Sequence, residues 1–305
     1  MTVHPSALGY RGRFAPTPSG PLHLGSLMTA LASWLEARTR SGIWLLRIDD
    51  LDRPRCVPGA EAQIREQLER HGLHWDEMPR YQSAHLGEYQ AALDALRAQH
   101  RLYACRCTRA ELAASGRAGP DGPVYAGTCR DTPLTSSEHA IRFRVDETTL
   151  RFGDGVHGLL MRELRDELGD FVVQRRDGIF GYHLACAVDE HAQRISDVVR
   201  GADLIGSTFA QLHLMQALSW PPPRYHHVPV MLDTNGLKLS KQNHARPIDA
   251  SRAGRNLWDC LRGLQQQPPP ALREADPATI LDWAQTQWRI ARVGTAVVPA
   301  VEPQS

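Results

Sequence analysis

The chain has 305 residues, of which 42% are hydrophobic and 23% charged, and its formal net charge is +1. These values fit one large or two modest globular domains, and no apolar run approaches the roughly 18 residues of a membrane span. A net charge near zero argues against strong non-specific attraction to nucleic acid, unless the basic residues cluster on one face. Because the N-terminus lacks the features of a signal peptide, we expect a cytoplasmic protein without membrane association.

The first hundred residues alternate between predicted strands and helices. Residues 11–25 indicate a short strand followed by a loop rich in proline and glycine. An apolar stripe predicts a helix over 26–40, and the continuous apolar run 43–48 predicts a buried strand. Amphipathic patterns predict helices over 60–71 and 84–99. This alternation is typical of a parallel α/β sheet.

The composition changes after residue 100. Residues 101–140 are rich in Gly, Thr, Ser and Cys, which indicates an insertion with its own small fold. The Asp-Gly pair within 174–182 predicts a hairpin. Further on, a strand is expected within 194–203, a helix over 207–218 and a strand over 228–232.

The last fifty residues give weaker patterns. Residues 258–264 and 278–288 predict two short helices, separated by a linker or helix break at 265–270. The final residues, 297–305, are expected to be frayed.

Lysine is almost absent from the chain. Of 35 basic residues other than histidine, 33 are arginines, and the two lysines, Lys238 and Lys241, lie in one stretch, GLKLSKQNH. Lysine offers a compact charge on a flexible stem, which suits a phosphoryl group that moves during a reaction. A genome that favours arginine codons explains the scarcity, but explains less well why both lysines share one loop.

The loop APTPSGPLHLGS precedes a predicted helix, whose free N–H groups and positive dipole end attract phosphate. Gly25 would let a nucleotide approach the backbone closely. His23 could donate a hydrogen bond to a phosphate oxygen, although alone it would more often be a surface or capping histidine.

Three of the six cysteines are clustered in the sequence: Cys105, Cys107 and Cys129. In a cytoplasmic chain they should be reduced, and three thiolates with one further ligand could bind Zn²⁺. Tyr125, His139 and His100 are the candidates for the fourth ligand. Three free cysteines without a metal remain the alternative.

The two loops together resemble the signature loops of class I aminoacyl-tRNA synthetases: PLHLG corresponds to their HIGH motif and KLSKQ to their KMSKS motif. The flanking sequence resembles the glutamyl branch of the family. It consists of RFAPTPSGPLHLG, LLRIDDLD, GYHLACAVDEH, VVRGADL and KLSKQNH, in family order over about residues 11–246. Ser26 stands where the second histidine of HIGH would be, as is common in glutamyl enzymes.

The resemblance implies an α/β fold, with a Rossmann-type parallel sheet that has helices on both faces and a small zinc-bearing insertion. The implied organisation has five parts. They are the first half of a nucleotide-binding catalytic domain (1–100), an acceptor-binding insertion (101–165), the second half of the catalytic domain (166–225), the lysine loop region (226–255) and a short helical tail (256–305).

Only some sixty residues follow the lysine loop, where a full glutamyl-tRNA synthetase carries a large anticodon-binding region. The chain therefore resembles truncated paralogues of the glutamyl branch, which glutamylate the queuosine of tRNA(Asp). We expect a monomeric ligase that uses ATP, L-glutamate and tRNA(Asp). The alternatives are a minimal synthetase that charges the tRNA 3′ end, and a non-catalytic paralogue that binds an amino acid or nucleotide.

The resemblance also assigns residues. Catalysis falls to His23, Lys238 and Lys241, and ATP with its Mg²⁺ to His23, Gly25, Ser26 and Lys241. The glutamate pocket comprises Arg13, Phe14, Ala15, Pro16, Thr17, Asp49, Tyr182 and Arg200. The family pattern selects Tyr125 to complete a structural zinc site with Cys105, Cys107 and Cys129.

Several of these residues have ordinary alternatives. Asp49 would face the substrate ammonium, although the family typically has the longer glutamate there; Asp49, Asp50 and Asp52 could instead pair with nearby arginines. Tyr182 alone would more often be a core aromatic residue. Arg13 and Arg200 alone would more often be solvated.

Overall fold

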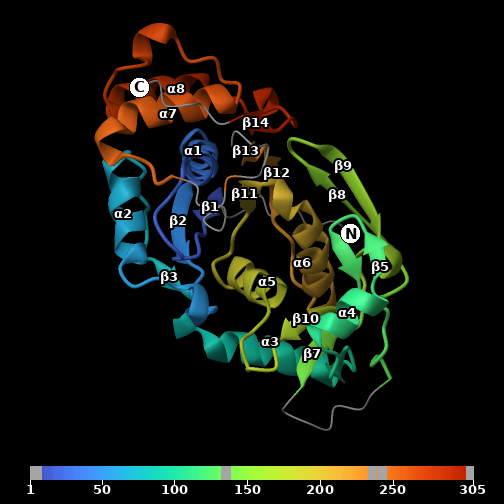
Figure 1. Cartoon of the computed structure of the whole chain (residues 1–305). Helices are drawn as coiled ribbons and strands as arrows, with labels where there is room; N and C mark the ends of the chain where they lie inside the picture. The colour runs from blue at the N-terminus through green and yellow to red at the C-terminus, as the bar shows by residue number, and fades with distance from the viewer. Residues whose placement is uncertain (1–8, 132–138, 233–238, 240–245, 300–305) are drawn as a thin grey trace.

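The computed structural model describes residues 9–131, 139–232, 239 and 246–299. Its centre is a twisted sheet in two hydrogen-bonded parts, β3-β2-β1 and β11-β12-β8-β9, in which only β9 runs antiparallel to its neighbour (Figure 1). The backbone N–H of Ser196, just before β11, donates to the carbonyl of Arg11 in β1 (3.0 Å). This hydrogen bond connects the two parts of the sheet. The strands are β1 (Arg11–Phe14), β2 (Ile43–Ile48), β3 (Arg80–Tyr81), β8 (Thr149–Asp154), β9 (Gly158–Glu163), β11 (Asp197–Gly201) and β12 (Arg224–Val228).

Alternate residues of β1 and β2 face opposite sides of the sheet, as the two-residue period of a strand requires. Phe14, Trp44 and Leu46 join the larger hydrophobic core, which also contains most of α1. Arg13 and Arg47 point the other way, toward acidic residues of α5. One side of the sheet therefore supplies packing and the other supplies charge.

The helices complete two cores. Helix α1 is buried along nearly its whole length because the sheet covers one side and α7 and α8 the other (Figure 1). Helices α3, α5 and α6 form a second core with the insertion. The helices are α1 (Leu24–Arg38), α2 (Ala60–Arg70), α3 (Leu86–Ala98), α5 (Tyr182–Ala192), α6 (Ile205–Ala217), α7 (Ala253–Gly263) and α8 (Pro277–Gln287).

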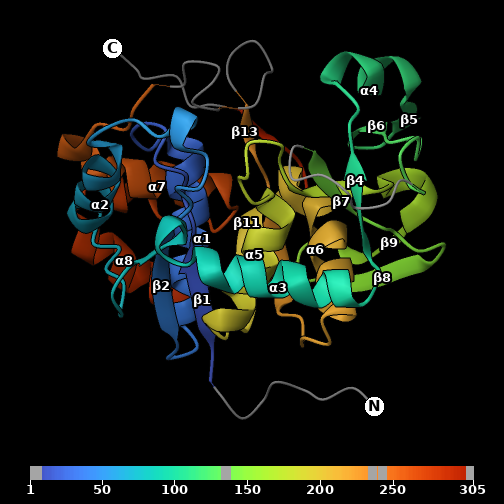
Figure 2. The same cartoon turned by 90° about the horizontal axis from the view of Figure 1, so that it is seen from below.

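The insertion combines a three-stranded antiparallel sheet, β4-β7-β10, with a small projecting unit of α4, β5 and β6 (Figure 2). Its elements are β4 (Leu102–Cys105), α4 (Arg109–Ser115), β5 (Arg117–Gly119), β6 (Gly122–Val124), β7 (Ala140–Phe143) and β10 (Phe171–Gln174). Pairing crosses the expected boundary at residue 165. Strand β8 pairs with β12 of the central sheet, and β10 returns to pair with β7 of the insertion.

The expected parallel α/β fold is confirmed, and the helices expected in the first hundred residues lie within two residues of their predicted bounds. Two expectations, the strand over 228–232 and the frayed end, were wrong at the residues given below, and the expected hairpin is present in a short form. The strand expected over 228–232 is split, because Pro229 cannot donate to a ladder and separates β12 from β13 (Met231–Leu232). The hairpin expected over 174–182 has one bridge, Gln174 to Phe180, before α5 begins. Within the expected frayed end, β14 (Val298–Pro299) pairs with β13.

Among the described residues, none of the helices has both the length and the apolar character that crossing a bilayer requires.

Candidate active site

A cavity of about 350 Å³ opens at the carboxyl ends of β1, β11 and β12. This edge is where open parallel sheets bind ligands, because the loops that follow the strands meet there. Three segments form its walls: the loop after β1, the start of α1 and the segment after β12. The lining residues are Phe14, Pro16, Thr17, Ser19, Leu22, His23, Gly25, Ser26, Thr29, Arg55, Gly201, Asp203, Leu204, Val230, Met231 and Leu239.

His23 is the N-cap of α1, at the floor of this cavity. Its Nδ1 accepts a hydrogen bond from the backbone N–H of Ser26 (3.2 Å), and the Ser26 hydroxyl accepts one from the backbone N–H of His23 (2.9 Å). Since Nδ1 is an acceptor, the neutral imidazole carries its proton on Nε2, the nitrogen on the far side of the ring. Ser26, which replaces the second histidine of the signature, thus locks the first one in place.

The two expected lysines, Lys238 and Lys241, lie outside the described residues. Leu239, between the lysines, and residues 246–248, after them, are described. The backbone N–H of Leu239 donates to the carbonyl of Met231 in β13 (2.7 Å), and that of Ile248 donates to the carbonyl of Leu22, beside His23 (2.9 Å). Pro247 forms a bridge with His23.

A buried charge network joins β1, β2 and α5, and its side chains are not among those that line the cavity. Arg13 donates to both carboxylate oxygens of Glu190 (2.9 and 3.0 Å), and Arg47 donates to Asp49 (2.8 Å) and reaches Glu190 at 3.4 Å. Burial disfavours the Glu190 carboxylate, but Arg13 and Arg47 hold the pKa of Glu190 below its ordinary value. Arg13 is therefore a fixed side chain, not a solvated one.

Asp49 differs from Glu190 in its electrostatics. Burial raises the pKa of Asp49 to about 6, and the opposing effect of Arg47 only partly offsets it. The carboxylate is thus poised to gain from a further positive charge. Perturbed acids of this kind are characteristic of functional sites, although structural ion networks perturb pKa values too.

Tyr182, Asp49 and Arg200 converge on one region around Cys186. Burial raises the pKa of the Cys186 thiol, and the charges of Asp49 and Arg200 act on it. The same two charges act on the Tyr182 hydroxyl. Tyr182 starts α5 and is 43% exposed, whereas Arg200 in β11 is 4% exposed. The Nη1 of Arg200 is buried and has no hydrogen-bond partner among the described residues. A buried guanidinium nitrogen without a partner indicates a place for an anionic ligand.

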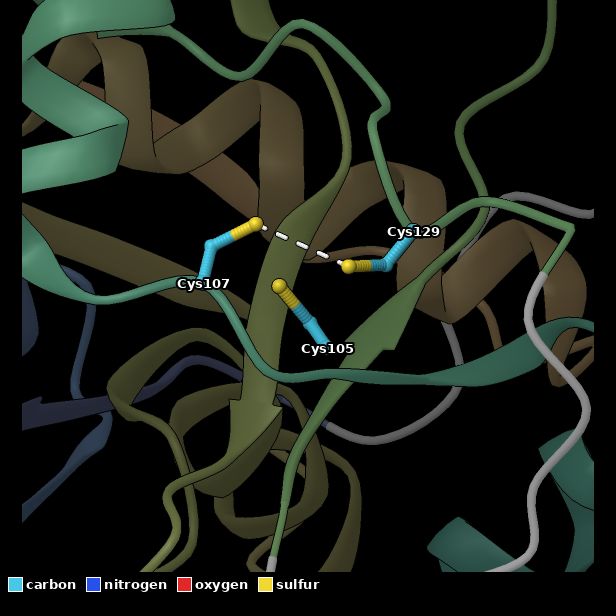
Figure 3. Close-up of side chains that lie close together, drawn as sticks. All are labelled: Cys105, Cys107 and Cys129. Carbon is cyan, nitrogen blue, oxygen red and sulfur yellow. Dashed lines mark hydrogen bonds between the residues drawn. The ribbon is translucent and has the colours of Figure 1, made fainter.

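The expected metal ligands also come together. The sulfurs of Cys105, Cys107 and Cys129 lie within 4.8 Å of one another (Figure 3). The Tyr125 hydroxyl is 3.5 Å from the Cys105 sulfur and 3.6 Å from that of Cys107. Among the described histidines, neither His100 nor His139 joins the group.

These spacings fit a tetrahedral zinc ion. With Zn–S bonds near 2.3 Å, ligand sulfurs should stand about 3.8 Å apart, and the Cys107 and Cys129 sulfurs are 3.6 Å apart. Burial raises the pKa of Cys107 to about 11, whereas backbone and side-chain hydrogen bonds outweigh burial and lower that of Cys129 to about 7. One thiolate is thus available at neutral pH, and a cation would favour the others.

The residues that hold the predicted site residues in place were not predicted from the sequence. Asp189 and Glu190 belong to the segment GYHLACAVDEH, but nothing in its sequence indicates that they pair with Arg47 and Arg13. Asp154 and His227, which contact each other, stood in unrelated segments.

Comparison with known proteins gives a consistent picture. Residues 10–262 match the family model of the catalytic domain of class I tRNA synthetases (E and Q). Glutamyl-Q tRNA(Asp) synthetase of Methylococcus capsulatus is 48% identical over 95% of this chain and 94% of its own length. The protein of the same name from Aromatoleum aromaticum is 46% identical over 95% and 92%. The crystal structure of a glutamate tRNA ligase from Elizabethkingia meningosepticum, in complex with its amino acid, superposes with a TM-score of 0.76. That ligase is 25% identical, and the match covers 95% of this chain and 67% of the ligase.

Proposed function

The chain belongs to the class I tRNA synthetases of the E and Q type, and we propose that it activates L-glutamate with ATP and transfers it to the queuosine of tRNA(Asp). The observation that carries this proposal is the joint presence of a histidine-capped helix and two buried arginines at one edge of a parallel sheet. The first can receive phosphates, and the second can receive carboxylates. The acceptor rests on the relatives, which carry it in their names and match the chain over nearly their whole length.

The reaction has two steps. A carboxylate oxygen of glutamate attacks the α-phosphorus of ATP, the bond to the β-phosphate breaks, and pyrophosphate leaves. A hydroxyl of the acceptor then attacks the activated carbonyl, and AMP leaves. Neither step requires a covalent bond to the protein, so positioning and charge stabilisation carry the catalysis.

On the ATP side, the start of α1 and the Nε2–H of His23 would contact phosphate oxygens. Gly25 leaves room there, because a Cβ would meet the His23 ring and Met231 at 3.3–3.4 Å. Lys238 and Lys241 are proposed to neutralise the phosphates, with Mg²⁺ bound to the nucleotide. Ser26 would act mainly through the cap that it forms with His23.

On the glutamate side, Arg13 and Arg200 would each receive one carboxylate and Asp49 the ammonium. Phe14 ends β1, Ala15, Pro16 and Thr17 follow it into the cavity wall, and Tyr182 would cover the substrate from the start of α5. Asp49 is held by Arg47 at 2.8 Å. Its shorter side chain would therefore draw the substrate ammonium closer to β2 than a glutamate would.

The pH dependence of glutamate binding tests this role of Asp49. With a pKa of about 6, Asp49 is only about one-tenth ionised near pH 5, so the KM for glutamate in pyrophosphate exchange should be about tenfold higher near pH 5 than near pH 7.5. In the Asp49→Asn variant, KM should be high at both pH values. An equal pH slope in the variant would show that another group titrates.

Lys241→Ala is expected to reduce pyrophosphate exchange by about 10²–10³-fold, because one charge on the transition state would be lost. The circular dichroism spectrum should not change. Lys241→Arg should recover only part of the rate, since a rigid fork follows a moving phosphate less well than an ammonium. Full activity in the alanine variant would contradict the assignment.

We further propose that Cys105, Cys107, Cys129 and Tyr125 hold one structural Zn²⁺. The geometry of the three thiols supports this, and the phenol is the least usual of the four ligands. The ion would stabilise the projecting unit of α4, β5 and β6 and would take no part in glutamate activation.

The test of the acceptor uses labelled glutamate and two tRNA pools, one that contains queuosine and one from cells that cannot make it. Label on the queuosine pool alone is the expected result. Equal label on both pools would identify a synthetase that charges the 3′ end. No label on either pool, together with no pyrophosphate exchange, would indicate a non-catalytic binding protein.

A further inference from the structure

A chain of buried polar contacts connects β8 to Arg200. The Nδ1 of His227 lies 2.6 Å from a carboxylate oxygen of Asp154, and the Nε of Arg200 lies 3.2 Å from the Nε2 of the same histidine. Asp154, His227 and Arg200 are 6%, 0% and 4% exposed. Neither contact could be read from the sequence, because the three residues lie on three separate strands.

The contacts fix which ring nitrogen of His227 carries the proton. Burial raises the pKa of Asp154, but hydrogen bonds from His227 and from the backbone N–H groups of His157 and Val156 lower it to about 2. The ionised carboxylate can only accept, so the His227 Nδ1 must donate. Burial lowers the pKa of His227, which keeps the ring neutral and leaves a lone pair on Nε2. That lone pair faces the N–H of Arg200 at 3.2 Å and the Thr208 hydroxyl at 2.9 Å.

The same arrangement orients the guanidinium of Arg200. Its Nε donates to His227, and its Nη2 donates to the Thr208 hydroxyl (2.7 Å). The ring of Tyr225 lies 5.2 Å from the guanidinium carbon and stacks against His227. Two of the three nitrogens are therefore committed. The remaining one, Nη1, has no hydrogen-bond partner in the described part of the chain.

We propose that Asp154 and His227 are positioning residues for glutamate binding: they hold Arg200, through the Nδ1–H tautomer of His227, with Nη1 directed at a substrate carboxylate. This inference rests on the proposed function, in which Arg200 binds glutamate. A carboxylate that accepts from a preorganised buried guanidinium is bound without the entropic cost of ordering a long side chain.

The competing explanation is that the pair only fastens two strands together. Asp154 also accepts a hydrogen bond from the backbone N–H of His227 (3.2 Å), which links β8 to β12. A purely structural link would affect stability but not the affinity for glutamate relative to ATP. The two explanations therefore differ in the ratio of the two KM values.

Asp154→Asn separates them. The backbone N–H groups of Val156 and His157 both donate to Oδ1 (2.9 Å), so the amide oxygen should stay there and the amide nitrogen should face His227. That nitrogen donates, so His227 must shift its proton to Nε2, where it opposes the N–H of Arg200. We expect the KM for glutamate in pyrophosphate exchange to rise about tenfold or more, with the KM for ATP unchanged, because a hydrogen bond to a charged group is lost.

Asp197→Asn is the matched control. Asp197 is a buried acid on β11, which flanks β12 on the side opposite β8. Its carboxylate pairs with Arg224 and lies 3.5 Å from the ring of His226, and its pKa is also about 2. Its removal should lower the melting temperature but leave both KM values unchanged. If Asp197→Asn raises the glutamate KM as much as Asp154→Asn does, the positioning role is wrong.

Arg200→Ala distinguishes a failure of this inference from a failure of the proposed function. If Arg200→Ala leaves the glutamate KM unchanged, the proposed glutamate site is wrong. If Arg200→Ala raises it and a folded Asp154→Asn does not, the site stands and the positioning role falls.

Nitrogen-15 NMR of histidine-labelled wild-type protein gives a test that needs no folded Asp154 variant. The His227 signal, identified by its loss in His227→Gln, should report the Nδ1–H tautomer. An Nε2–H or doubly protonated ring in the wild-type protein would overturn the inference.

Discussion

His23→Ser is expected to reduce pyrophosphate exchange by about 10²–10³-fold without lowering the melting temperature. Serine is a preferred N-cap residue, so its hydroxyl can accept the backbone N–H of Ser26 that Nδ1 accepts now. Serine cannot replace the Nε2–H, which lies on the far side of the ring. Loss of one preorganised donor to a reacting phosphate has an effect of this size. Pyrophosphate exchange with saturating ATP and glutamate measures it.

His23→Ala is the matched variant, because it loses the cap and the donor together. It should show the same loss of rate as His23→Ser and, in addition, a loss of about 1 kcal/mol in the free energy of unfolding. If serine restored the rate and alanine did not, His23 would act by starting the helix, and its contact with ATP would be wrong.

Cys129→Ala is expected to abolish stoichiometric zinc binding and to open the projecting unit of the insertion. Structural zinc contributes roughly 10–16 kcal/mol in zinc-finger peptides, so loss of a ligand exceeds what the short elements α4, β5 and β6 can offset. Metal analysis should find one zinc per wild-type chain and less than one in the variant. Hydrogen exchange over residues 106–131 should become fast.

The Cys129→Ala variant should lose one of the two activities and keep the other. Pyrophosphate exchange should persist, because the charge network and the His23 loop lie in the central sheet, while transfer to tRNA should be lost. Cys56→Ala is the control: Cys56 is outside the cluster, and its removal should leave the zinc content unchanged. One zinc per chain in Cys129→Ala, or a wild-type protein that contains none, would contradict the assignment.

Local sequence patterns predicted the elements in which apolar residues are buried and polar residues are exposed. The run 43–48 is apolar and became β2 without a change of bounds, because a buried strand needs no other signal. The predicted strand 228–232 began at the last residue of β12, because Arg224, His226 and His227 are polar residue types. Both histidines are nevertheless buried. Their burial depends on Asp197 and Asp154, acids that come from other strands.

The residues of the site likewise fall into those that could be predicted from the sequence and those that could not. The loop that carries His23 could be predicted because its chemistry is local: a cap, a glycine and a helix start within a few residues. Glu190 could not be assigned a role, because it acts on Arg13, 177 residues away in the chain. Pairing over such distances is a property of topology, which hydrophobic period and turn residues do not encode.

The pairing of Arg13 and Arg47 with α5 has a consequence for how the protein is made. A nascent chain that ends before residue 189 already contains β1, β2 and β3, but Arg13 lacks Glu190, and Arg47 has Asp49 without the two acids of α5. Burying a guanidinium without its partner costs several kcal/mol, so burial of Arg13 on that face is unfavourable until α5 is made. Strand β1 also waits for β11, because the hydroxyl of Ser196, the residue before β11, accepts the backbone N–H of Arg11 across 185 positions. The amino-terminal half is thus committed to late folding, and its exposed edge and unpaired charges need protection until α5 leaves the ribosome.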